Sequence, residues 1–367
     1  MRDIPSLTGL RGVAALWVMG FHVGKVADEA HAPWAAHLGL LGFGWTGVDL
    51  FFVLSGFILM WVHGADFRRP TKAALGRFVA ARIVRVYPLS LAVLLLILLL
   101  AWADPSFVAW YKAQNADNFT LQAFARTACL ATRWIAGGGG DWNEPTWSLS
   151  AEVVGYGAFP LLAWAMTRAS PKVAAAVGVL SLATLAAFEI LTGLAGTNAI
   201  DQIPALMRMG CGFIAGMAVC RARGAVGDRA PAWAASGSLG ALLAIGLVCQ
   251  ARLGVLLAPA GFALLIFCLS FQLGALNGLL SSRIALFLGR ISFPLYLIHL
   301  MPLLWLASHV RIGALPPLGT VAVISGYLAF CMMGAVLLHL LVERPLHRWA
   351  RRGFPLSAAR RVLAQAA

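Results

Sequence analysis

Long apolar stretches recur along the whole chain and are separated by short polar segments. Each stretch has about 20 residues, the length of helix that crosses a hydrocarbon layer of about 30 Å at about 1.5 Å per residue. The pattern predicts about ten transmembrane helices, at residues 8–27, 44–63, 82–103, 146–167, 172–193, 203–222, 231–250, 255–274, 286–308 and 318–342. The predicted fold is therefore an all-α, multi-pass integral membrane protein.

Composition agrees with this prediction. Of the 367 residues, 60% are hydrophobic and only 11% are charged, which excludes a soluble globular domain of this size. The six cysteines lie mostly inside apolar stretches, without CxxC spacing or flanking histidines. We interpret them as small packing residues and expect no metal site.

The net charge of +14 is explained by where the basic residues lie. An even number of spans places both termini on one side, and a cytoplasmic N-terminus gives the cytoplasmic segments most of the lysines and arginines. These are Arg68, Arg69, Lys72, Arg77, Arg82, Arg85, Arg168, Lys172, Arg221, Arg223, Arg229, Arg283, Arg344, Arg348, Arg351, Arg352, Arg360 and Arg361. Such asymmetry predicts cytoplasmic termini and a lipid bilayer, rather than nucleic acid, as the partner of the basic charge. We divide the chain into a transmembrane domain, 1–345, and a basic cytoplasmic tail, 346–367.

The segment from Asp104 to Asp141 is expected on the outer side. It contains several tryptophans, which favour the headgroup layer when they lie near span ends. We predict a short helix on the outer surface at residues 119–135. The run Gly137 to Gly140 is interpreted as a flexible linker, because a phosphate-binding loop would be followed by lysine and serine or threonine.

Ionisable residues inside apolar spans are costly and indicate functional sites. Arg11 and His22 in the first span are eleven residues apart, hence about 16.5 Å apart along a helix and about 20° apart around it. Taken singly, each residue has an equally good structural explanation: Arg11 reaches the headgroups, and His22 bonds to a neighbouring helix. Their shared face favours a functional role.

Two carboxylates lie in other spans. Asp49 is expected near the outer end of its helix, where it would either orient the His22 imidazole or cap the helix N-terminus. Ser148, Glu152 and Tyr156 are spaced by four and share one face. Because Glu152 has no basic partner in its own helix, it must be protonated, paired with another span or in a wet cavity, which favours function.

Arg82 and Arg85 share a face at the cytoplasmic surface and would suit a bidentate clamp for phosphates. Taken alone, they are better explained as the ordinary basic flank of a span. At the end of the last span, Glu343-Arg344-Pro345 predicts a helix stop with a local ion pair near the headgroups and no catalytic role.

Ser292, Tyr296 and His299 form a polar stripe in the ninth span, since they are spaced at i, i+4 and i+7. A contact between helices and a substrate-lining role are equally consistent with this stripe.

Five segments together resemble the membrane acyltransferase-3 family, which O-acylates sugars of lipopolysaccharide, exopolysaccharide, nodulation factors and some antibiotics. They occur in the family's order along nearly the whole chain. The segments are Arg11 with His22, Gly47-Val48-Asp49-Leu50-Phe51-Phe52-Val53-Leu54-Ser55-Gly56-Phe57, Arg82 with Arg85, Trp147-Ser148-Leu149-Ser150-Ala151-Glu152, and Ser292-Phe293-Pro294-Leu295-Tyr296-Leu297-Ile298-His299.

The resemblance implies a ten-helix enzyme of the bacterial cytoplasmic membrane with a cytoplasmic acyl-coenzyme A donor, such as acetyl-coenzyme A. The acceptor would be a glycan or glycolipid, usually at the outer face. Many relatives carry an additional hydrolase-like domain, and this chain is expected to be the standalone form. A secondary transporter is the main alternative. Against it, we find no matching pair of Gly/Pro-interrupted helices in the two halves.

The resulting hypothesis gives each residue a role. Arg11, Arg82 and Arg85 hold the donor phosphates. His22 is the central catalytic residue, either as a base or as an acyl carrier, with Glu152 and Asp49 in support. Substrate contacts are assigned to Trp147, Ser148, Tyr156, Tyr296 and His299.

Overall fold

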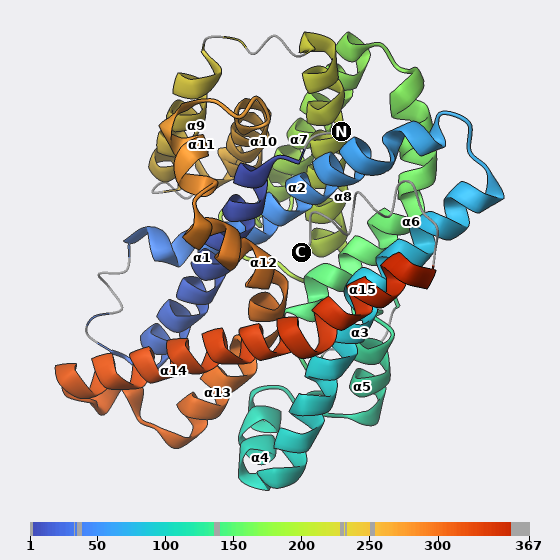
Figure 1. Ribbon diagram of the computed structural model, residues 1–367. Coiled ribbons are helices and arrows are strands. Elements are labelled where there is room, and N and C mark those ends of the chain that lie inside the picture. The colour runs from blue at the N-terminus through green and yellow to red at the C-terminus, as the bar shows by residue number, and fades with distance from the viewer. Residues whose placement is uncertain are drawn as a thin grey trace.

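A computed structural model describes residues 3–32, 34, 39–135, 140–227, 231, 233–249 and 254–353 (Figure 1). Over these residues the chain is helical and contains no strand, as predicted. Residues 137–139 of the expected glycine linker, Arg229, and residues 354–367 of the expected basic tail lie outside the described residues.

Every predicted span coincides with a helix or a pair of helices. The α-helices are α1 Pro5–Glu29, α2 Gly47–His63, α3 Lys72–Ala103, α4 Pro105–Gln114, α5 Leu121–Ala128, α6 Thr146–Arg168, α7 Pro171–Leu191, α8 Gln202–Val226, α9 Ala234–Val248, α10 Ala258–Leu269, α11 Gly274–Leu280, α12 Arg283–Ile298, α13 Leu300–His309, α14 Pro317–Leu338 and α15 Arg344–Gly353.

Fewer than ten of these helices satisfy the length and apolarity expected of a span. Among the described residues, six helices do so, and two bent pairs raise the number to eight. The pairs are α10 with α11, bent by 91°, and α12 with α13, bent by 48°. Helix α9 has only 15 residues. The chain is thus a multi-pass membrane protein by these criteria, whereas ten spans and cytoplasmic termini stay predictions.

Helices α2 and α8 pack closely through glycines. A Cβ on Gly56 would lie 1.9 Å from the Phe213 carbonyl oxygen, and a Cβ on Gly216 would lie 2.0 Å from the Val53 carbonyl oxygen. Any side chain would therefore push the backbones apart. Helices α1 and α12 meet in the same way, since a Cβ on Gly289 would lie 2.1 Å from the Thr8 carbonyl oxygen.

The segment from Asp104 to Asp141 contains two short helices: α5 lies within the predicted range 119–135, and α4 precedes it and was not predicted. Asp104 caps α4 by accepting from the Phe107 N–H at 3.0 Å, and Thr120 caps α5 by accepting from the Ala123 N–H at 3.2 Å. Hydrogen bonds from the Ser106 hydroxyl and the Phe107 N–H lower the pKa of Asp104 to about 2. Helix α5 ends early because the chain turns at Leu130, whose φ is 51°.

The predicted helix stop at Glu343 is wrong. Residues His339–Glu343 form a π-helical turn, and α15 follows directly, so that α14 and α15 make one nearly continuous rod (Figure 1). The wider turn changes the direction of the side chains, and Glu343 is only 3% exposed. It accepts hydrogen bonds from Arg85 and from His339 Nδ1, in place of the expected local pair with Arg344.

Candidate active site

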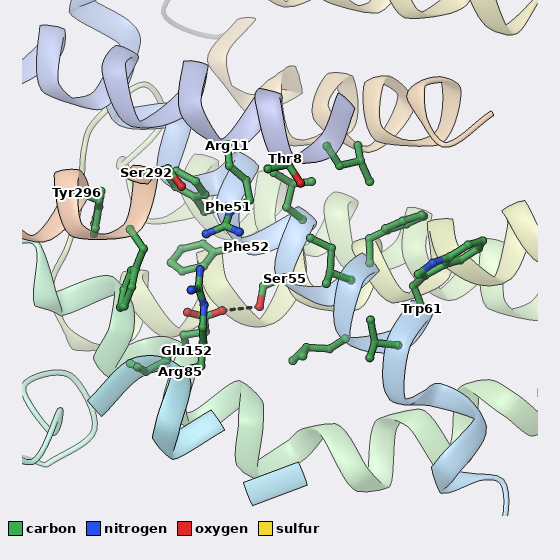
Figure 2. A pocket seen from close by; sticks show the side chains of 18 of the residues that line it. Thr8, Arg11, Phe51, Phe52, Ser55, Trp61, Arg85, Glu152, Ser292 and Tyr296 are labelled. Atoms are coloured by element: carbon green, nitrogen blue, oxygen red, sulfur yellow. Dashed lines mark hydrogen bonds between the residues drawn. The ribbon is translucent and has the colours of Figure 1, made fainter. Parts of the chain in front are cut away.

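A cavity of about 370 Å³ lies among α1, α2, α3, α6 and α12, and it collects most of the polar residues noted in the sequence (Figure 2). The predicted site residues that line it are Arg11, Arg82, Arg85, Ser148, Glu152, Tyr156 and Tyr296. They come from four helices that are distant in sequence. The close packing of α1 against α12 and of α2 against α8 supports two sides of this cavity.

The cavity is strongly electropositive. Four arginines line it, Arg11, Arg82, Arg85 and Arg290, against two carboxylates, Asp3 and Glu152. Figure 2 shows Arg11 from α1 and Arg85 from α3 pointing toward one another, with Glu152 beside Arg85. Like charges directed at one point in an apolar interior favour an anionic ligand there.

The arginines differ in how far their hydrogen bonds are satisfied. Arg85 donates to Glu343 and lies over the Phe293 ring at 5.3 Å. Arg82 lies 5.8 Å from the Tyr156 ring centroid, and its Nε and Nη2 are buried with no hydrogen-bond partner among the described residues. Buried, unpaired N–H groups on a cation are costly, so a ligand that accepts hydrogen bonds would stabilise Arg82.

Glu152 receives a hydrogen bond from the Ser55 hydroxyl, as Figure 2 shows. The sequence prediction that Glu152 needs a partner from another span, or a wet cavity, agrees with this position. No role for the Ser55 hydroxyl was predicted from the sequence. The two residues are 97 positions apart, and no spacing within either helix indicates the pair.

Hydroxyl groups from α6 and α12 form one wall of the cavity. Ser148 Oγ and Tyr296 OH are 2.8 Å apart, and each also donates to the Pro145 carbonyl oxygen at 3.1 Å. Ser292, which also lines the cavity, donates to the Gly289 carbonyl oxygen at 2.8 Å. The predicted polar stripe on the ninth span therefore faces the cavity through Ser292 and Tyr296.

His22 and His299 lie next to each other but outside the cavity lining. Their ring centroids are 5.1 Å apart, and the His299 ring is 5.9 Å from that of Tyr296. His299 is 1% exposed, with Nδ1 2.7 Å from the Tyr296 carbonyl oxygen. His299 Nε2 is buried without a hydrogen-bond partner in the described part of the chain. Tyr296 thus lines the arginine-lined cavity and also lies next to His299.

Asp49 takes neither of its two expected positions. Its carboxylate accepts from Arg208 Nε at 2.9 Å and from Arg208 Nη2 at 3.0 Å, and both residues are at least 95% buried. It is therefore neither an exposed cap nor a partner of His22. In an apolar interior a guanidinium binds a carboxylate more strongly than a neutral imidazole does. Trp147, predicted to contact substrate, lies 5.2 Å from the Arg208 guanidinium and outside the cavity lining.

Three further residues were missed as partners in the site. Arg290 lines the cavity, Arg208 holds Asp49, and Glu343 holds Arg85. Arg208 and Arg290 are ionisable residues inside apolar stretches, and that signal alone would have singled them out. Glu343 gave no such signal, because a carboxylate at a span end usually lies among headgroups.

Comparisons with known proteins show the family of this chain. The family described as "Acyltransferase domain" matches residues 4–340. Acyltransferase MdmB of Streptomyces mycarofaciens is 32% identical over 165 residues, which cover 43% of this chain and 38% of that protein. O-acetyltransferase OatA of Staphylococcus aureus strain NCTC 8325 is 27% identical over 207 residues, which cover 54% of this chain and 31% of that protein. The matches therefore span less than half of either relative, and no solved structure matches.

Proposed function

Because the chain belongs to the acyltransferase-3 family, we propose that it is a membrane O-acyltransferase. The proposed donor is acyl-coenzyme A, with acetyl as the expected acyl group. The proposed acceptor is a hydroxyl of a glycan or glycolipid. The observation that carries this proposal is the convergence of four arginines on one cavity beside two adjacent histidines.

The arginine-lined cavity suits the phosphates of the donor. Coenzyme A carries several phosphate charges, and guanidinium groups bind phosphate oxygens with two parallel N–H donors. The lining has four arginines and two carboxylates, and Glu343 pairs with Arg85, so the positive charges still outnumber the negative ones. The unpaired Nε and Nη2 of Arg82 supply buried donors that a phosphate oxygen would satisfy.

The acyl group would react near the Tyr296 wall. In the proposed step, His22 removes the proton from the acceptor hydroxyl, whose oxygen bonds to the acyl carbon. The carbon–sulfur bond breaks, and the thiolate takes up a proton to leave as the coenzyme thiol. The hydroxyls of Ser148 and Tyr296 would stabilise the oxyanion that forms between these events. A route in which His22 first carries the acyl group uses the same residues.

Transfer to His22 requires a path past Tyr296. Tyr296 lies between the cavity and His299, and its hydroxyl bonds only to groups of the 145–148 segment in the described structure. A rotation of this side chain would connect the cavity with the histidine pair.

The purified protein, incubated with labelled acetyl-coenzyme A, tests the function directly. Release of free coenzyme A, or label on a glycan, supports the acyltransferase. Solute uptake into vesicles that is independent of the coenzyme, with no consumption of the donor, would instead support a secondary transporter, the class that also contains bent helices such as α12 with α13.

A further inference from the structure

A second cavity, of about 590 Å³, lies among the end of α4, the connecting segments on either side of α5, the segment before α6 and the start of α8. Its charged lining residues are Arg133, Asp141, Glu144 and Asp201. Helix α3 continues for 18 residues from Arg85 to its end at Ala103, which corresponds to about 27 Å of rise. The second cavity therefore lies toward the opposite end of α3 from the arginines.

A buried carboxylate is fixed at the second cavity. Asp141 is 7% exposed, and its Oδ2 accepts from Arg133 Nη2 at 2.9 Å. Its backbone N–H donates to Asn118 Oδ1 at 3.1 Å, and Arg133 is itself held by the Ile200 carbonyl oxygen at 2.6 Å. Burial raises the pKa of Asp141, and the Arg133 charge opposes that rise.

The other oxygen of this carboxylate is left unsatisfied. Asp141 Oδ1 is buried and has no hydrogen-bond partner among the described residues. An acceptor in this state costs free energy unless a donor from outside the chain bonds to it. A hydroxyl or ammonium group of a ligand is such a donor.

The remaining polar groups of the second cavity define the class of ligand. Amides and hydroxyls, which bond in both directions, predominate in the lining. The charged residues of the lining are one cation, Arg133, and three acidic residues, Asp141, Glu144 and Asp201. The excess of negative charge disfavours phosphate and carboxylate groups, in contrast to the first cavity with its four arginines.

One stretch of chain connects the two cavities. Asp141 and Glu144 line the second cavity, and Ser148 and Glu152 line the first. Between them, the Asn143 side chain donates to the Leu297 carbonyl oxygen at 3.0 Å, and the Pro145 carbonyl oxygen accepts from Tyr296. Residues 141–152 therefore run from the second cavity to the first, and two hydrogen bonds attach them to α12 between the cavities.

We propose that the second cavity is the acceptor site, and that it binds an uncharged or amino-bearing sugar ring, one hydroxyl of which donates to Asp141 Oδ1. This role rests on the proposed acyl transfer, whereas the binding itself needs no donor. The two substrates would approach the Tyr296 wall from opposite sides.

Saturation-transfer NMR on the full chain in detergent micelles, without any donor, tests this site with glucose, glucosamine and glucose 6-phosphate. Glucose and glucosamine should bind, and glucose 6-phosphate should bind at least about tenfold more weakly because of the three carboxylates. Asp141→Asn should weaken glucose binding about tenfold, since it removes a charged acceptor. Glu144→Lys should strengthen glucose 6-phosphate binding about tenfold.

The matched control is Glu29→Gln, which changes a carboxylate paired with Lys25 on the surface and should bind all three sugars as the wild type does. Asp141→Asn also weakens the Arg133 pair, so Glu144→Lys serves as the independent variant. Equal binding of the three sugars, a preference for glucose 6-phosphate, or wild-type behaviour of Glu144→Lys would overturn the proposal. Turnover of acetyl-coenzyme A without sugar binding overturns this site alone, whereas sugar binding without any turnover contradicts the acyltransferase instead.

Discussion

His22 is the residue on which the proposed chemistry depends most. It is half-buried, its ring centroid lies 5.1 Å from that of His299, and the His299 ring lies 5.9 Å from that of Tyr296. Loss of the proton acceptor should lower transfer at least about hundredfold, the scale of general-base catalysis. We therefore expect His22→Ala to abolish label transfer from acetyl-coenzyme A while the thermal unfolding of the protein stays unchanged.

His309→Ala is the matched control for that variant. His309 lies at the end of α13 beside Asp104 and does not line the arginine-lined cavity, and its removal should leave transfer intact. Full activity of His22→Ala would eliminate the mechanism.

Asp49 and Arg208 give a prediction about stability. Removing one partner of a buried ion pair leaves an uncompensated charge and typically costs about 3–5 kcal/mol. Asp49→Ala should therefore lower the midpoint of thermal unfolding strongly, and the double variant Asp49→Ala with Arg208→Met should recover part of the loss. If Asp49→Ala instead kept wild-type stability and lost only transfer, Asp49 would act on the chemistry as first expected.

At the residue scale, spacing within a helix was a reliable guide, whereas partners across helices were not. Ser148, Glu152 and Tyr156 were expected on one face, and all three line the same cavity. Asp49 was assigned to His22 because both were expected at the same depth in the membrane. Depth alone does not fix a partner: Arg208, 159 positions away, supplies the stronger charge.

At the scale of elements, a helix or a pair of helices lies at every apolar stretch that was predicted to span the membrane. The apolar stretches did not indicate where a helix bends or changes its hydrogen-bonding pattern. The ninth span divides at His299 with a 48° bend, and the last span continues through a π-helical turn into α15. The bend in the ninth span coincides with Pro302, which has no N–H to donate to the Ile298 carbonyl at the end of α12. The π-helical turn brings Glu343 to Arg85, a contact between helices that leaves no mark on the apolar pattern.

The contact between α2 and α8 gives a prediction for an element. Gly216→Ala should destabilise the protein by about 1–3 kcal/mol, because its Cβ would overlap the Val53 carbonyl oxygen at 2.0 Å and the helices would have to separate. Gly210→Ala, in the same helix, is the control, since no atom lies within 4 Å of its Cβ. Thermal unfolding of the purified variants measures both, and equal midpoints would contradict the close packing.

At the scale of the whole molecule, two cavities of opposite charge character lie toward opposite ends of α3. The sequence singled out three of the four arginines of the first cavity, Arg11 as a cation inside an apolar stretch and Arg82 with Arg85 as a pair on one helix face, but it missed Arg290. It did not predict the second cavity, which is assembled from the outer segment and the start of α8. There the side chains are ordinary polar residues of connecting segments, and only the fold brings Asp141 and Asp201 to one cavity.

The opposite charges of the two cavities are the reason that we propose a different substrate for each. A phosphate-bearing donor suits the arginines, and a hydroxyl-rich acceptor suits the carboxylates and amides. Reaction would take place at the wall between them, where Tyr296, His299 and His22 follow one another.

Calorimetric titration of the full chain with coenzyme A tests the central claim, that the arginine-lined cavity holds the phosphates of the donor, most directly. Coenzyme A should bind, and pantetheine, which lacks the phosphates, should bind far more weakly. The double variant Arg82→Ala with Arg85→Ala should raise the Kd for coenzyme A at least about tenfold. Lys72→Ala with Arg77→Ala, which removes two exposed cations from the same helix, should leave that Kd unchanged. An unchanged Kd in the Arg82 and Arg85 variant, or equal binding of pantetheine, would contradict the account.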